Sequence, residues 1–62
     1  MSWATIIKEL RGNLLLTQTE FASLFNVSFV SVNRWEKGKC EPTMKQKRII
    51  SELCKKNGVK IK

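Results

Sequence analysis

The chain has 62 residues, 42% hydrophobic and 27% charged, which excludes two domains, a barrel and disorder throughout. It contains no His, Asp or Tyr, so neither a Ser–His–Asp triad nor a His-ligated metal site can be built. The net charge of +7 favours a polyanionic partner, and the absence of a membrane-length apolar run or a signal-peptide pattern predicts a cytoplasmic protein.

The first predicted helix covers about residues 2–11. Four apolar side chains recur at helical spacing: Trp3, Ile6, Ile7 and Leu10. Ser2 suits the N-cap position, and Gly12-Asn13 is a stop signal. Three leucines follow this stop signal, and exposing their side chains to water in a loop is unfavourable. We therefore expect two of them to be buried: Leu14 or Leu15, and also Leu16.

A capping box predicts the start of a second helix over residues 18–25. The Thr17 hydroxyl is placed to accept a hydrogen bond from the Glu20 N–H, and the Glu20 carboxylate to reach back to residue 17. Leu16 and Phe21 are placed for a hydrophobic staple. The predicted apolar face consists of Phe21, Ala22, Leu24 and Phe25. Because so short a helix does not persist alone, we expect tertiary packing to hold it.

Asn26 predicts a tight turn before a third helix over residues 29–37, because Asn tolerates left-handed backbone dihedrals. Ser28 suits the N-cap of this helix, and Gly38 suits the position after its end. Two apolar side chains are expected to point inward, Val32 and Trp35. The opposite side is expected to carry Phe29, Val30, Asn33, Arg34 and Lys37.

Thr43 is the predicted N-cap of a fourth helix that runs to about Lys56 and is closed by Asn57-Gly58. Its predicted apolar stripe consists of Met44, Ile49 or Ile50, Leu53 and Cys54. Residues 59–62 alternate like a short strand that has no partner. We therefore expect a domain of residues 1–58 and a short basic tail, 59–62.

The basic excess lies towards the C-terminal end. Residues 1–42 hold five basic and four acidic residues, whereas residues 43–62 hold seven basic residues and Glu52. Cys40 and Cys54 stand 14 positions apart without a C-x-x-C motif, so we expect neither a zinc site nor a disulfide. The sequence thus predicts no metal, no cofactor and no catalytic residues.

Residues 17–37 combine two short helices with a tight turn, which is helix-turn-helix geometry. Five segments carry the signature: Leu10-Arg11, Leu16-Thr17-Gln18-Thr19-Glu20-Phe21-Ala22, Val27-Ser28, Arg34-Trp35-Glu36-Lys37-Gly38-Lys39 and Pro42. They resemble the lambda repressor/Cro-like, or XRE, helix-turn-helix family over about residues 4–56. The resemblance implies an all-α, compact bundle of four or five short helices, with the third helix in the major groove of DNA.

The resemblance and the side-chain chemistry together give candidate contacts with double-stranded DNA. Base readout is expected from Ser28, Phe29, Val30, Asn33 and Arg34. Phosphate contacts are expected from Gln18, Lys37, Lys39, Thr43 and Lys45. The resemblance also implies a structural pair between Arg11 and Glu36 that orients the third helix.

For several of these residues the sequence leaves two possible roles open. Arg34 can grip guanine in bidentate fashion, and Asn33 can read adenine or contact phosphate. Phe29 and Val30 can meet thymine methyl groups, whereas packing against the second helix is the alternative for Phe29. Gln18 can be a solvated first-turn residue, and Trp35 is expected in the core rather than stacked on a base.

Sequence-specific DNA binding by a small transcriptional regulator is the preferred function. The alternative is a protein-interaction module with the same fold, such as a toxin-neutralising antitoxin or a transcription bridging factor. Membrane-surface binding by the basic fourth helix ranks lower, because its apolar stripe is narrow, and an enzyme with a small-molecule substrate ranks last. We expect a monomer that self-associates weakly on DNA, at half-sites one helical turn apart.

Overall fold

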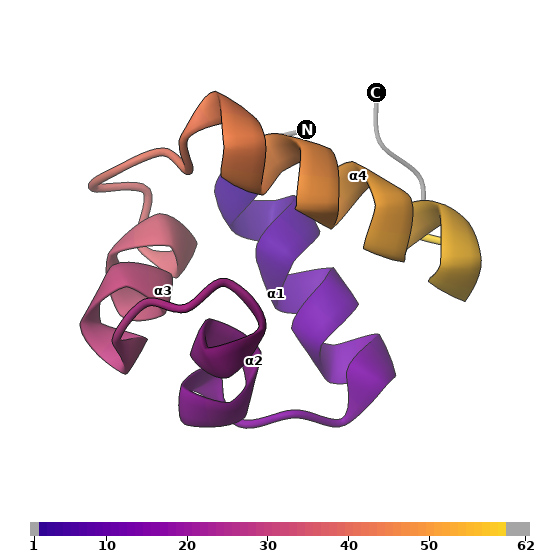
Figure 1. The fold of residues 1–62 in the computed structure, drawn as a ribbon, viewed down its shortest axis with the longest axis horizontal. Coiled ribbons are helices and arrows are strands. Elements are labelled where there is room, and N and C mark those ends of the chain that lie inside the picture. Colours follow the sequence, from indigo (N-terminus) through magenta and orange to yellow (C-terminus); the bar gives the residue numbers. More distant parts are fainter. Residues whose placement is uncertain (1, 60–62) are drawn as a thin grey trace.

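A computed structural model describes residues 2–59, which form four α-helices and no strand (Figure 1). The helices are α1 (Trp3–Leu14), α2 (Gln18–Leu24), α3 (Phe29–Glu36) and α4 (Met44–Asn57). α1 packs against both α3 and α4, and α2 packs against α3 (Figure 1). The predicted all-α bundle of short helices is confirmed, with four helices in the described part of the chain.

Side-chain caps start three of the four described helices where the sequence predicts. The Ser2 hydroxyl accepts from the Thr5 N–H at the start of α1. Complete capping boxes begin α2, where Thr17 pairs with Glu20, and α4, where Thr43 pairs with Gln46. These starts are predictable because a cap involves only residues within one turn of each other.

The predicted end of the first helix at Arg11 is wrong, because α1 continues through Gly12 and Asn13 to Leu14. The chain reverses at Leu15, which has a left-handed φ of 58°. The longer helix places Leu14 partly against the core. Burial of a leucine outweighs the roughly 1 kcal/mol that a helical glycine costs.

The three leucines after the predicted stop have different environments. Leu14 and Leu16 are half-buried and pack against the core, while Leu15 is 89% exposed. The N–H groups of Leu15 and Leu16 donate to carbonyls of the last turn of α1, and thereby close the helix.

The turn between α2 and α3 forms around Asn26, whose φ of 59° is left-handed as predicted. α2 ends at Leu24 and α3 at Glu36, each one residue earlier than expected. The predicted apolar face of α2 is wrong at Leu24, which is half exposed. Leu24 lies on the side of α2 that faces solvent, whereas Phe21 and Ala22 lie on the side that faces the core.

All four helices contribute to one core, which consists of Ile6, Ile7, Leu10, Phe21, Ala22, Phe25, Val32, Trp35, Ile50, Cys54 and Val59. The Phe25 ring joins α2 to α3, with its centroid 5.0 Å from that of Phe21 and 5.6 Å from that of Trp35. Aromatic pairs at these separations add stabilisation beyond area burial.

The apolar stripe predicted for α4 is wrong at the N-terminal end of the helix. Ile50 and Cys54 are buried and Ile49 and Leu53 half-buried, but Met44 is 68% exposed and its assignment to the core was wrong. Met44 occupies the first position of the helix, beyond the reach of the core.

The prediction that the tail begins at Val59 is wrong, because Val59 lies in the core and is 5% exposed. Gly58, with φ 73°, turns the chain so that the Val59 N–H donates to the Cys54 carbonyl at 2.9 Å. This helix ending characteristically brings the residue after the glycine back onto the helix. The rest of the predicted tail, 60–62, lies outside the described residues.

The capping box of α2 gives a first prediction. Thr17→Ala removes the acceptor for the Glu20 N–H and should destabilise the protein by about 1 kcal/mol. For a domain of this size that lowers the melting temperature by roughly 4–8 °C, measured by thermal denaturation. Thr19→Ala is the matched control, because Thr19 is exposed in the same helix and caps nothing. Equal melting temperatures for the two variants would contradict the capping role.

Candidate nucleic-acid interface

α3 divides its side chains between the core and the solvent. Val32, Trp35 and Glu36 are buried, and they follow one another at the spacing of one helix face. Four of the five predicted outward residues are exposed, namely Phe29, Val30, Arg34 and Lys37, whereas Asn33 is half-buried. Phe29 is 52% exposed, so it faces solvent and does not fill the core between α2 and α3.

The inner face of α3 is held by a network around the Glu36 carboxylate, hereafter the Glu36 network (Arg11, Gln18, Asn33 and Glu36). The predicted pair forms with two hydrogen bonds, from Arg11 Nε to Glu36 Oε2 at 2.6 Å and from Arg11 Nη2 to Glu36 Oε1 at 3.1 Å. Arg11 Nη1 also donates to the Leu16 carbonyl at 3.2 Å. The guanidinium therefore ties α1, the loop before α2, and α3 together.

Gln18 and Asn33 also join this network, which the sequence did not predict. Gln18 Nε2 donates to Glu36 Oε1 at 3.0 Å, and Asn33 Nδ2 donates to Gln18 Oε1 at 3.4 Å. Both side chains are half-buried. Gln18 was expected on a phosphate, but in the structure both ends of its amide are used within the protein.

A signal for this placement was present in the sequence. Gln18 stands three and four positions before the buried Phe21 and Ala22, and Glu36 stands four positions after the buried Val32. Residues at these spacings share one face of a helix. The polar residues on the two inward faces could therefore have been expected to meet.

The two charges of the pair shift each other's titration. Burial alone raises the pKa of Glu36, but hydrogen bonds from Arg11 and Gln18, with the charges of Arg11 and Lys8, outweigh it and leave the pKa below its ordinary value. The hydrogen bond to Glu36 raises the pKa of Arg11 despite a smaller opposing effect of burial. Both groups are therefore charged at neutral pH.

α3 begins differently from the other described helices. Ser28 occupies its N-cap position, but the hydroxyl makes no capping hydrogen bond. Ser28 is exposed. Its hydroxyl and the positive end of the helix dipole are thus available to a polar or anionic ligand.

The candidate phosphate residues beyond α3 lie along the segment that connects α3 to α4 and at the start of α4 (Figure 1). Lys37, Lys39 and Lys45 are exposed. The Thr43 hydroxyl accepts the Gln46 N–H, so its acceptor capacity is used in the cap. Gly38 sharpens the turn after α3 with a φ of 75°.

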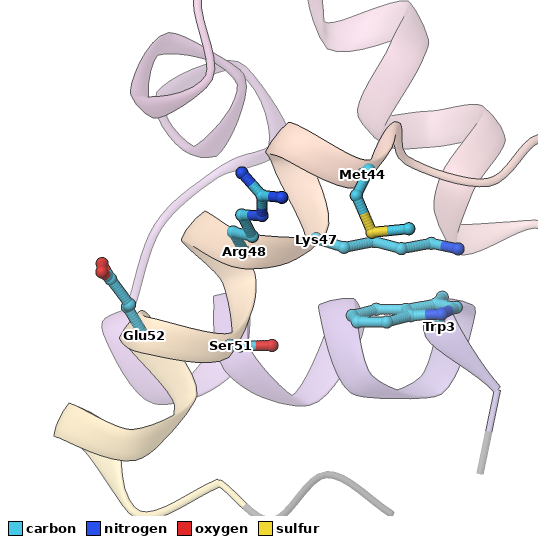
Figure 2. Close-up of a pocket in the computed structure, with 6 residues that line it drawn as sticks. All are labelled: Trp3, Met44, Lys47, Arg48, Ser51 and Glu52. Atoms are coloured by element: carbon cyan, nitrogen blue, oxygen red, sulfur yellow. The ribbon is translucent and has the colours of Figure 1, made fainter.

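A surface hollow of about 470 Å³ lies on another side, lined by Trp3, Met44, Lys47, Arg48, Ser51 and Glu52 (Figure 2). The Trp3 ring lies beneath Lys47, with Nζ 5.3 Å from the ring centroid. Lys47 also pairs with Glu41 at 3.1 Å. α1 and α4 alone line this hollow, so it is separate from the outward face of α3.

The described residues show neither a metal-binding cluster nor a membrane-length helix. Within residues 2–59, no three of the Cys and Glu side chains come together as metal ligands. No helix in this part of the chain is both long and apolar enough to cross a membrane. Cys40 is exposed and Cys54 is buried, and both are free thiols.

Comparison with protein families finds a match over most of the chain. The family model described as helix-turn-helix matches residues 7–61 and so includes all of α2, α3 and α4. No curated protein and no solved structure shows significant similarity to the chain.

The Glu36 network gives a second prediction. Arg11→Met and Glu36→Gln should each destabilise the protein by about 2–3 kcal/mol, because each leaves a poorly compensated partner. A double-mutant cycle by chemical denaturation should show a coupling energy above about 1 kcal/mol.

The matched control for this cycle is the pair of Lys47 with Glu41, whose Glu41 side chain is 72% exposed. Such an exposed pair should couple by less than about 1 kcal/mol. Equal coupling in the two pairs would contradict a special role for Glu36.

The lowered pKa of Glu36 gives a third prediction, on acid stability. Because the folded-state pKa lies below the ordinary 4.5, the stabilisation is present above pH 4.5 and is lost as the pH falls through the folded-state value. The difference in unfolding free energy between the wild type and Glu36→Gln should therefore shrink below pH 4.5. A constant difference between neutral and acid pH would refute this linkage.

Proposed function

Because the chain belongs to the lambda repressor/Cro-like helix-turn-helix family, a family of DNA-binding regulators, we propose that it binds double-stranded DNA sequence-specifically and regulates transcription. α3 lies in the major groove in this proposal, and its exposed face reads the base edges. The main support for the proposal is that α3 has two distinct faces. Its inner face is buried and held by the Glu36 network, and its outer face exposes Phe29, Val30 and Arg34.

Arg34 is the proposed residue for guanine. Its exposed guanidinium belongs to no ion pair among the described residues, so the planar fork can bind O6 and N7 together. Ser28, Phe29 and Val30 are the other proposed base contacts. Asn33 contacts a base with the part of its amide that Gln18 leaves free.

Phosphate contacts are proposed for three exposed lysines: Lys37 at the C-cap of α3, Lys39 in the following segment, and Lys45 in the first turn of α4. Thr43 contributes its hydroxyl proton, since the oxygen already accepts the Gln46 N–H. Gln18 contributes less directly than expected, by holding Asn33. These contacts fix the register of α3 on the duplex without reading sequence.

The second candidate is a protein-interaction module, such as an antitoxin or a transcription bridging factor. It is favoured by two large apolar side chains exposed at the start of α3, Phe29 at 52% and Val30 at 42%. Aromatic and aliphatic side chains on a surface often anchor protein interfaces. The family and the positive charge of the chain favour DNA.

Titration of duplexes tests the roles of Arg34 and the lysines, after a preferred site is selected from a random pool. Arg34→Ala should cost about 1–3 kcal/mol on the preferred site and relax the preference at one position. Lys39→Ala and Lys45→Ala should weaken preferred and scrambled duplexes equally. Each lysine variant should reduce the salt slope by about one unit.

Lys56→Ala is the matched control, because Lys56 is exposed in the last turn of α4, at the end remote from α3 (Figure 1). It should retain the salt slope of the wild type. Equal loss on both duplexes with Arg34→Ala would make Arg34 a phosphate contact. Failure of the wild type to bind any duplex would reject DNA binding and favour a protein partner.

A further inference from the structure

The outer face of α3 has a composition that narrows what it can recognise. Its exposed side chains are Phe29, Val30, Arg34 and, at the end of the helix, Lys37. The single carboxylate of the helix, Glu36, is buried and paired. Asn33 donates its amide N–H to Gln18. The face therefore offers mainly apolar surface and a cation. Its acceptors are neutral, the Ser28 hydroxyl and the Asn33 Oδ1, and it exposes no carboxylate for the amino group of cytosine.

Helix geometry fixes the distance between the apolar surface and the cation on this face. Val30 and Arg34 stand four residues apart, so they share one face about 6 Å apart along the axis. That separation is less than two base-pair steps of about 3.4 Å. Phe29 extends the apolar surface beside Val30 at the N-terminal end of the helix.

One chemical group of the major groove matches an apolar surface. The C5-methyl group of thymine is the apolar feature among the base edges, while guanine presents the O6 and N7 acceptors that suit arginine. A cytosine methylated at C5 carries its methyl group at the same place. Exposed aromatic and aliphatic surface gains stability when it covers such a group and releases water.

We propose that Phe29 and Val30 bind the 5-methyl group of a pyrimidine adjacent to the guanine held by Arg34. Affinity then depends on the methyl group itself, separately from base pairing. This inference rests on the proposed function, because it requires α3 to lie in the major groove. The methyl group can come from thymine or from 5-methylcytosine, and the test distinguishes the two.

The experiment uses the full chain and the duplex selected from a random pool. Each thymine of that duplex is replaced in turn by deoxyuridine, which pairs identically but lacks the methyl group. We expect one or two positions beside the guanine at which affinity falls about fourfold, the factor for burying one methyl-sized group. Replacing the T·A pair there by a C·G pair, with and without the 5-methyl group on cytosine, tests the second source.

Two variants connect the effect to the named side chains. Val30→Ala and Phe29→Ala should reduce the preference for thymine over deoxyuridine towards one at the affected positions. Both side chains are partly exposed, so the fold should tolerate their loss, which circular dichroism checks. Met44→Ala is the matched control, because it removes an exposed apolar side chain from α4 and should leave the preference unchanged.

The outcomes separate this inference from the proposed function. If no duplex is selected, DNA binding itself fails. If a duplex is bound but all deoxyuridine substitutions are neutral, methyl recognition is overturned while DNA binding stands. If both variants keep the wild-type affinity and methyl preference, the apolar pair does not read DNA, and the assignment is likewise overturned. A gain with 5-methylcytosine over cytosine extends the proposal to both sources, and a gain with thymine alone restricts it to thymine.

Discussion

The position of α3 depends on one buried charge. Glu36 is 6% exposed, and a carboxylate in such a place is tolerated only when its oxygens are hydrogen-bonded. Arg11 supplies two of those bonds from α1, and Gln18 supplies another from α2. The same guanidinium holds the carbonyl of Leu16. Three helices are thereby fixed around one group, and an outward-facing surface on α3 acquires a defined position.

The aromatic contacts and the Glu36 network perform complementary tasks. A helix of eight residues does not persist alone, so α3 needs the apolar contacts of Trp35 with Phe25 to form at all. Apolar contacts are not directional. The hydrogen bonds around Glu36 restrict rotation of α3 about its own axis, which decides whether Val30 and Arg34 face outward. Both sets of side chains therefore stabilise the fold, but only the hydrogen bonds around Glu36 also fix the orientation of α3.

Local signals in the sequence predicted the fold well where they act within one turn. The caps at Thr17 and Thr43 and the left-handed Asn26 are of this kind. The helix end predicted from Gly12-Asn13 is wrong, because packing of Leu14 against the core extends α1 beyond this local stop signal. Val59 also lies in the core for a tertiary reason, since the turn at Gly58 folds it back. For the candidate site, the Arg11–Glu36 pair came from the family resemblance, whereas the role of Gln18 as a bridge depends on how α2 and α3 cross.

The burial of Val59 has a consequence for the order of folding during synthesis. The core includes Ile6 and Ile7 near the start of the chain and Ile50, Cys54 and Val59 near its end. On the ribosome, the helix-turn-helix segment emerges before α4 and has an unfilled apolar side until α4 and Val59 follow. Contacts between the two ends of a chain form late, because closing the intervening loop has an entropic cost. Translation must therefore pass residue 59 before every buried side chain of the core is available, whereas the residues that orient α3 emerge earlier.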